Sequence, residues 1–204
     1  MNELDLLDWK RHVFELYATV RAARDPADAW TLWREARDEL FRTHPQSPLP
    51  ADARASFAGL EYFPYDPVFR VVADVEPADA EIREIAGSAG STTRFRRFGR
   101  ARFELADAPQ ALELFWLEGY GGGVFLPFGD LTSGSETYGG GRYLLDTVKG
   151  AELGGSTGRL VLDFNFAYNP SCAYDPRWAC PLTPPANRLS LEIRAGELHI
   201  PAVR

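Results

Sequence analysis

The sequence predicts an α+β fold that is mainly β, an antiparallel barrel or sandwich-like meander preceded by an N-terminal helical pair. Apolar residues recur every three or four positions in the first 45 residues, and short β-rich runs follow from residue 55 onward. Turn residues rather than long helices separate these runs, which favours antiparallel pairing over parallel βαβ units. We expect a single domain over residues 1–204, with a helical pair (1–45), a β-rich body (55–204) and a Pro-rich loop (169–187).

The first predicted helix carries one apolar stripe, with charged residues on its other faces. Asp25 and Pro26 begin the second helix, because aspartate caps free N–H groups and proline fits the first helical position. This helix runs to about Phe41, before a proline-rich stretch that starts at Pro45. The stripe of the first helix consists of Leu6, Trp9, Val13, Leu16, Tyr17 and Val20.

Nine runs of β-forming residues are predicted as strands. Gly99 and the segment Gly119–Gly123 separate pairs of them and are interpreted as hairpin turns, because glycine tolerates the positive φ of such turns. The runs are Leu60–Phe63, Val68–Val75, Thr92–Phe98, Arg102–Leu105, Ala111–Leu117, Val124–Phe128, Tyr143–Val148, Leu160–Phe164 and Leu189–Ile193.

The charge and hydropathy of the chain argue against two classes of partner. A net charge of −7 and a pI near 5.0 argue against a nucleic-acid partner, which requires a basic face. No apolar run approaches the roughly 20 residues of a membrane helix, so no membrane partner is expected. The N-terminus is acidic and lacks the apolar core of a secretory leader, which predicts a cytoplasmic protein.

Polar residues and glycines are concentrated in segment 127–146, which includes Asp130, Glu136, Tyr138 and Arg142. Glu136 and Arg142 are a candidate ion pair, and the backbone N–H groups are candidate anion donors. The alternative is a polar turn in which Asp130 satisfies the local backbone.

The next run places Asp163 and Asn165 on one face of a predicted strand, with Asn169 following. If that face is buried, both side chains need partners, and Arg142 is the expected counter-ion of Asp163. If that face is exposed to solvent, the two residues need no partners and have no special role.

The chain has two cysteines, Cys172 and Cys180, in the Pro-rich loop. They could form a disulfide, bind a metal with nearby carboxylates, supply a nucleophile, or remain structural thiols. No metal is expected, because His12, His44 and His199 lack metal-ligand spacing to them.

A basic cluster occupies a predicted hairpin around Gly99. Arginine forks bind carboxylates or phosphates at two points, which is compatible with an anionic ligand. The alternative is a solvated edge strand protected against aggregation by its charges. The cluster consists of Arg94, Arg96, Arg97, Arg100 and Arg102.

Two stretches of the chain, GDLTSGSETYGGGRYL and LDFNFAYNPSCAYDPRWACPLTPPANRL, resemble the bacterial and archaeal family called domain of unknown function 1684. The resemblance extends more loosely to the N-terminal helices and to the segment around Gly196. It implies a shared domain but no established activity, cofactor or catalytic residue. Some members of the family look secreted or lipid-anchored.

Two functions compete. The first is a pocket for a small polar or anionic ligand, with hydrolysis or proton transfer as the reaction class if the protein is an enzyme. The second is a non-catalytic module, in which the polar groups lock the Pro-rich loop in place and the helices or arginines bind a protein partner. No cofactor is assigned. The candidate pocket consists of Asp130, Glu136, Tyr138, Arg142, Asp163, Asn165, Asn169 and Cys172.

Overall fold

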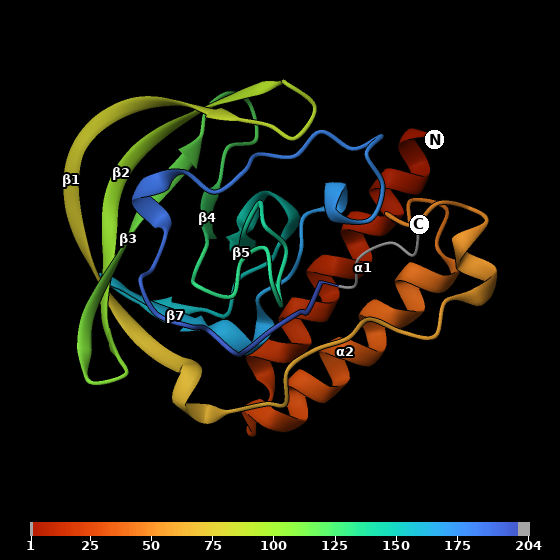
Figure 1. Cartoon of the computed structure of the whole chain (residues 1–204), viewed down its shortest axis with the longest axis horizontal. Helices are drawn as coiled ribbons and strands as arrows, with labels where there is room; N and C mark the ends of the chain where they lie inside the picture. Colours follow the sequence, from red (N-terminus) through yellow and green to blue (C-terminus); the bar gives the residue numbers. More distant parts are fainter. Residues whose placement is uncertain (1, 200–204) are drawn as a thin grey trace.

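The computed structural model describes residues 2–199 and begins with two helices, α1 over Glu3–Ala22 and α2 over Pro26–Thr43 (Figure 1). Each helix starts where a side chain accepts free N–H groups of the first turn. Asn2 caps α1 and Asp25 caps α2, which confirms the predicted start of the second helix. No helix within the described residues is both long and apolar enough to cross a membrane.

Seven strands form one sheet in the order β5-β4-β3-β2-β1-β7-β6. All pairs are antiparallel, so the predicted mainly β, antiparallel class is confirmed. The sheet is sandwich-like and does not close into a barrel, because β5 and β6 remain its edges. The strands are β1 (Arg70–Ala86), β2 (Thr92–Leu105), β3 (Ala108–Leu117), β4 (Val124–Phe128), β5 (Arg142–Asp146), β6 (Gly155–Ser156) and β7 (Arg159–Asp163).

The long strands β1 and β2 curve around one side of the molecule (Figure 1). The register of their ladders shifts between Pro77 and Glu81 and again between Arg97 and Gly99. Such irregularities bend a strand and increase its twist. The prediction of a hairpin turn at Gly99 is wrong, because Gly99 lies inside β2, where an added Cβ would stand 2.9 Å from the carbonyl oxygen of Glu76.

Two other strand predictions are wrong. Leu60–Phe63 contributes only an isolated bridge between Tyr62 and Glu197. Leu189–Ile193 belongs to the C-terminal segment, which crosses the sheet (blue in Figure 1) and packs Leu189 and Ile193 into the main core without joining a ladder. Its apolar residues cover the sheet instead of extending it.

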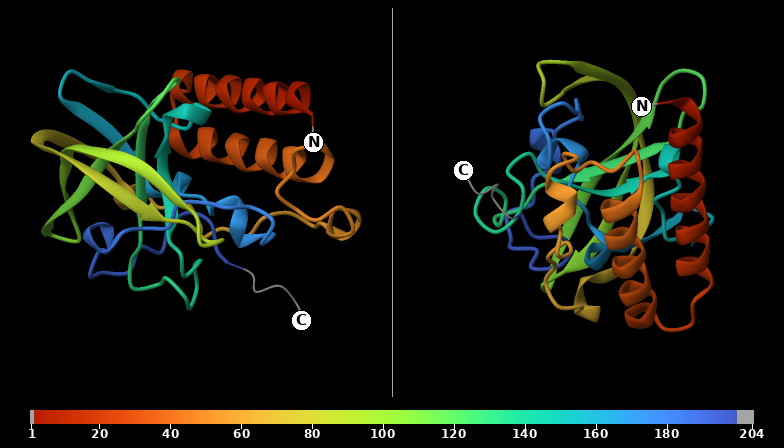
Figure 2. Two further views of the ribbon diagram at one scale, coloured as in Figure 1. Left: turned by 90° about the horizontal axis from the view of Figure 1, so that it is seen from above. Right: turned by 90° about the vertical axis from the view of Figure 1, so that its right-hand side faces the viewer.

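The helices lie side by side against one side of the β-rich body (Figure 2). Trp33 of α2 is fully buried and packs on Tyr62 and Phe166, with ring centroids 5.6 and 5.1 Å away. The indole N–H of Trp30 donates to the backbone oxygen of Asn165 at 2.9 Å. The helical pair is therefore packed onto the segment that follows β7.

Candidate functional site

Arg142 and Asp130 form a buried ion pair, with 2.9 Å between Arg142 Nη2 and Asp130 Oδ2. The guanidinium also donates to the backbone oxygens of Ile193 and Ala195. Burial lowers the pKa of Arg142, while Asp130 opposes this effect. The pair thereby connects β5 to the C-terminal segment.

Asp130 has no capacity left for a ligand. Its Oδ1 accepts from the backbone N–H and hydroxyl of Thr132, at 2.8 and 2.6 Å, and from the N–H of Ile193 at 3.3 Å. The expected pair of Glu136 with Arg142 is wrong, because the carboxylate of Glu136 lies 3.1 Å from Arg194 on the surface. Asp130 instead orders the turn that follows β4.

Asp163 is buried at the end of β7, but its counter-ion is Arg70, with 3.5 Å between Arg70 Nη1 and Asp163 Oδ2. The expected pair with Arg142 is therefore wrong. Asp163 Oδ1 accepts from the backbone N–H and the side-chain amide of Asn165, at 3.0 and 2.8 Å. Asn165 in turn exchanges two hydrogen bonds with the backbone of Asp66. Burial raises the pKa of Asp163.

The arginine cluster lies on β2, which has β1 and β3 on its two sides, so the hairpin and edge-strand interpretations are both wrong. Its members face carboxylates. Arg97, for example, lies 2.8 Å from the buried carboxylate of Glu113 and 3.1 Å from the carboxylate of Glu81. These cations pair with the protein's own acids across the strands.

The side chains of Asp8, His12 and His44, which no sequence motif connects, lie together at the helices. One ligand atom each from Asp8, His12 and His44 falls within 4.8 Å of the others. However, His44 Nδ1 accepts the backbone N–H of Gln46 at 3.0 Å, so Nε2 carries the proton and donates to Asp8. A protonated Nε2 has no lone pair for a metal ion, and the cluster is a poor metal site.

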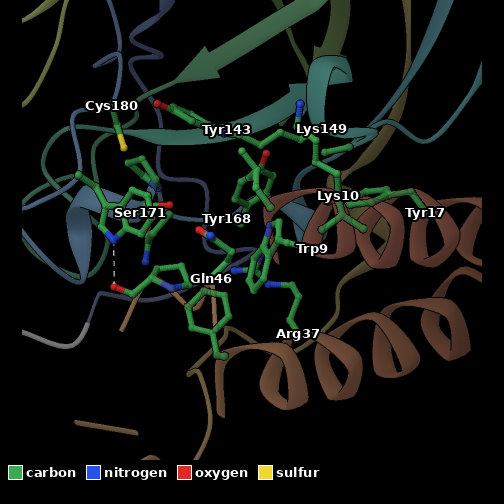
Figure 3. Close-up of a pocket in the computed structure, with 18 residues that line it drawn as sticks. Trp9, Lys10, Tyr17, Arg37, Gln46, Tyr143, Lys149, Tyr168, Ser171 and Cys180 are labelled. Atoms are coloured by element: carbon green, nitrogen blue, oxygen red, sulfur yellow. Dashed lines mark hydrogen bonds between the residues drawn. The ribbon is translucent and has the colours of Figure 1, made fainter. Parts of the chain in front are cut away.

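A cleft of about 160 Å³ opens where α1, α2, β5 and the Pro-rich loop meet (Figure 3). Trp9, Lys10 and Tyr17 enter it from α1, while Tyr168 stands in the middle of the close-up. The wall is mostly aromatic and apolar. Of the predicted pocket residues only Asn169 lines it. The other lining residues are Leu6, Val13, Arg37, Phe41, Gln46, Pro48, Tyr143, Lys149, Ala151, Pro170, Ser171, Trp178 and Cys180.

The lining of the cleft includes three cations, of which two are paired with carboxylates. Lys10, Arg37 and Lys149 line it, and no carboxylate is among the lining residues. Arg37 is paired behind the wall with the buried Glu197 at 2.8 Å, and Lys149 is paired with Asp146 at 2.8 Å. Lys10 has no carboxylate within 4.0 Å in the part of the chain that the structure describes.

Asn169 lines the cleft and holds a buried acceptor that has no partner in the described part of the chain. Its side-chain N–H donates to the backbone oxygen of Leu198 at 2.8 Å, and its backbone N–H donates to Glu197 at 3.1 Å. Its Oδ1 is buried and has no hydrogen-bond partner among residues 2–199. A buried oxygen without a partner costs about 1–3 kcal/mol, so a ligand N–H or O–H that donated to it would gain from doing so.

Sequence reasoning missed the cleft because its residues come from five separate parts of the chain. One signal was present in the composition. Of the 22 lysines and arginines only two are lysines, Lys10 and Lys149, and both line the cleft.

Comparison with known proteins agrees with the fold but names no activity. The chain is 35% identical to the uncharacterized protein from gene locus rrnAC0354 of Haloarcula marismortui, known from a solution NMR structure, with a TM-score of 0.61. The match covers 81% of this chain and 89% of that chain. No curated protein matches. The family described as "Protein of unknown function (DUF1684)" matches residues 55–198, which confirms the resemblance in the sequence, and the chain therefore belongs to the DUF1684 family.

Proposed function

We propose that the protein binds a small amphipathic anion in the cleft between α1 and the Pro-rich loop. The observation that carries the proposal is the wall itself, which combines aromatic rings with three cations and no carboxylate. Ligand sites are typically concave and mostly apolar, with a few polar groups that fix the orientation of the ligand. Here the rings suit an aromatic or apolar body, and the cations suit its anionic group.

The polar groups of the cleft divide the expected ligand into two ends. Lys10 favours a carboxylate or phosphate, because its ammonium group carries a full charge and, unlike that of Lys149, has no carboxylate partner among the described residues. Asn169 Oδ1 is covered by protein atoms, and a ligand N–H or O–H would satisfy it only after these atoms moved aside. Burial holds the pKa of Tyr168 well above its ordinary value, so its hydroxyl stays protonated and can donate.

This proposal moves the ligand site away from the polar cluster predicted from the sequence. Asp130, Arg142, Asp163 and Asn165 already have partners within the protein, which supports the non-catalytic interpretation of that cluster. Hydrolysis or proton transfer stays a prediction. The cleft wall offers Ser171 and Cys180 as hydroxyl and thiol, but its lining residues include no histidine or carboxylate to act as a base.

Two matched pairs of compounds test the proposal by calorimetric titration. Indole-3-acetate and phenyl phosphate carry an aromatic body and a negative charge, and indole-3-acetamide and phenol are their uncharged counterparts. At least one anion should bind, and should bind more tightly than its uncharged counterpart. If neither anion binds, or if the neutral compounds bind equally well, the proposal is wrong.

The two lysines give a second readout. Reductive ¹³C-methylation keeps their charge and labels only Lys10, Lys149 and the N-terminal amine. The bound anion should shift both lysine signals. Lys10→Gln should weaken binding by about 1 kcal/mol, roughly fivefold, whereas Arg102→Gln on β2 should leave it unchanged.

A further inference from the structure

The two cysteine thiols lie next to each other in the Pro-rich loop. Both are free and half-buried. The sulfur of Cys180 accepts a hydrogen bond from the backbone N–H of Cys172 at 3.3 Å. Cys172 lies in the short 3₁₀ helix Ser171–Ala173, Pro176 lies between the two cysteines, and Pro170 and Pro181 flank them, so this proximity is built into a stiff loop.

Cys172 is surrounded by hydrogen-bond donors. The hydroxyl of Tyr138 lies 3.6 Å from its sulfur, and the Cys180 thiol is a second neighbouring donor, whereas the hydroxyl of Ser88 donates to the backbone oxygen of Trp178. The hydrogen bond from Cys180 is the largest of the effects that lower the pKa of Cys172, to about 6, against the opposing effect of burial. The same hydrogen bond, together with burial, raises the pKa of Cys180. Cys172 is therefore the more acidic of the two thiols.

We propose that Cys172 and Cys180 form an oxidisable dithiol site, at which Cys172 reduces a hydroperoxide and Cys180 closes an intramolecular disulfide. The inference does not depend on the identity of the ligand in the cleft. It adds a reaction to a protein for which we otherwise propose only binding, and Cys180 links the two regions because its side chain also lines the cleft.

The reaction balances with hydrogen peroxide as the oxidant. The Cys172 thiolate attacks one peroxide oxygen, the O–O bond breaks, and the products are a sulfenic acid on Cys172 and hydroxide. The Cys180 sulfur then attacks the Cys172 sulfur, the S–O bond breaks, and water leaves with the thiol proton. Two electrons pass from the two sulfurs to the peroxide, and an added dithiol restores both cysteines.

The order of the two steps is tested with single variants of the whole chain. Hydrogen peroxide should convert the reduced protein to a monomer that has lost two hydrogens and both free thiols. Cys180→Ser should stop at a sulfenic acid on Cys172, which dimedone traps, whereas Cys172→Ser should give no adduct on Cys180. A disulfide between two molecules, or equal trapping at both positions, would overturn the proposal.

The rate at which hydrogen peroxide oxidises Cys172 distinguishes a specific reactive site from two ordinary thiols. Cys172 should be oxidised about tenfold faster at pH 7 in the folded protein than in the urea-unfolded protein. Tyr138→Phe should slow the reaction severalfold, because it removes a donor to the Cys172 sulfur, whereas Tyr120→Phe at a fully exposed tyrosine should not. Equal rates in the folded and unfolded protein, or in the two tyrosine variants, would contradict the proposal.

Discussion

Arg142 and Asp130 share an ion pair that solvent does not reach, since their side chains are 1% and 0% exposed. Two charges removed from water lose their hydration, and their attraction compensates only when the remaining polar atoms also find partners. Here the backbone oxygens of the C-terminal segment and the turn after β4 provide those partners. The pair therefore couples the ordering of three segments of chain.

Removing the guanidinium should strongly destabilise the fold. Arg142→Ala leaves Asp130 buried without a counter-ion, and we expect the free energy of unfolding to fall by about 3–5 kcal/mol in urea denaturation. Arg102→Ala is the matched control, because its pair with Glu76 is half-exposed and should contribute at most about 1 kcal/mol. Equal effects of the two variants would mean that the buried pair does not stabilise the fold.

The buried carboxylate of Asp163 should make stability depend on pH. Its pKa is raised above the ordinary 3.8, mainly by burial, so the protonated form favours the folded state. The stabilisation is complete at low pH and is lost as pH rises through the raised folded-state pKa. Asp163→Asn cannot ionise. The stability of the natural protein relative to this variant should therefore fall as pH rises above about 4 in urea titrations, and a constant or rising difference would contradict the assignment.

Both Asn187→Ala and Asn187→Asp should destabilise the protein, and the second should destabilise it more. Its fully buried amide donates to the backbone oxygens of Glu113 and Pro127 at 3.0 and 2.8 Å, and its oxygen accepts from the N–H of Glu113. Asn187→Ala leaves these groups without partners, at about 1–3 kcal/mol. Asn187→Asp should cost more, because a carboxylate oxygen would face two carbonyls. Thermal and chemical denaturation should rank Asn above Ala above Asp.

Gly141→Ala should destabilise the protein more than Gly119→Ala, although both glycines have positive φ. At φ +89° an added Cβ would lie 2.0 Å from the hydroxyl oxygen of Thr183 and 2.7 Å from the carbonyl oxygen of Phe128. Gly119 also has positive φ, at +106°, but an added Cβ there meets nothing within 4 Å. Both alanine variants carry the backbone strain, so the difference between their unfolding free energies, about 1–3 kcal/mol, measures the steric clash at Gly141.

The parts of the fold that depend on local chemistry could be predicted from the sequence. The cap at Asp25 and the glycine turn Gly119–Gly123 follow from neighbouring residues and were correctly predicted. Gly99 was not, because a turn and a bulge require the same small residue, and only the partner strand distinguishes them. The second half of β1 was missed because Pro77 and the charged residues after it lack strand periodicity.

The candidate site was less predictable because its ion pairs join residues that are far apart in the sequence. The sequence correctly marked Asp163 as an acid that needs a partner if buried, but it did not show that β7 pairs with β1 and so brings Arg70 beside it. The cleft depends in the same way on how α1 packs against the Pro-rich loop. The scarcity of lysine was the one sequence property that indicated Lys10 and Lys149 together.

The pair of Arg37 with Glu197 joins α2 to a residue 160 positions later in the chain. A ribosome releases the N-terminal helices long before this carboxylate is made. Until then Arg37 lacks its countercharge, and the emerging polypeptide has to keep an incomplete interior from associating with other chains. Protein truncated before Glu197 should consequently require chaperones and be degraded, even though most of its sheet is present.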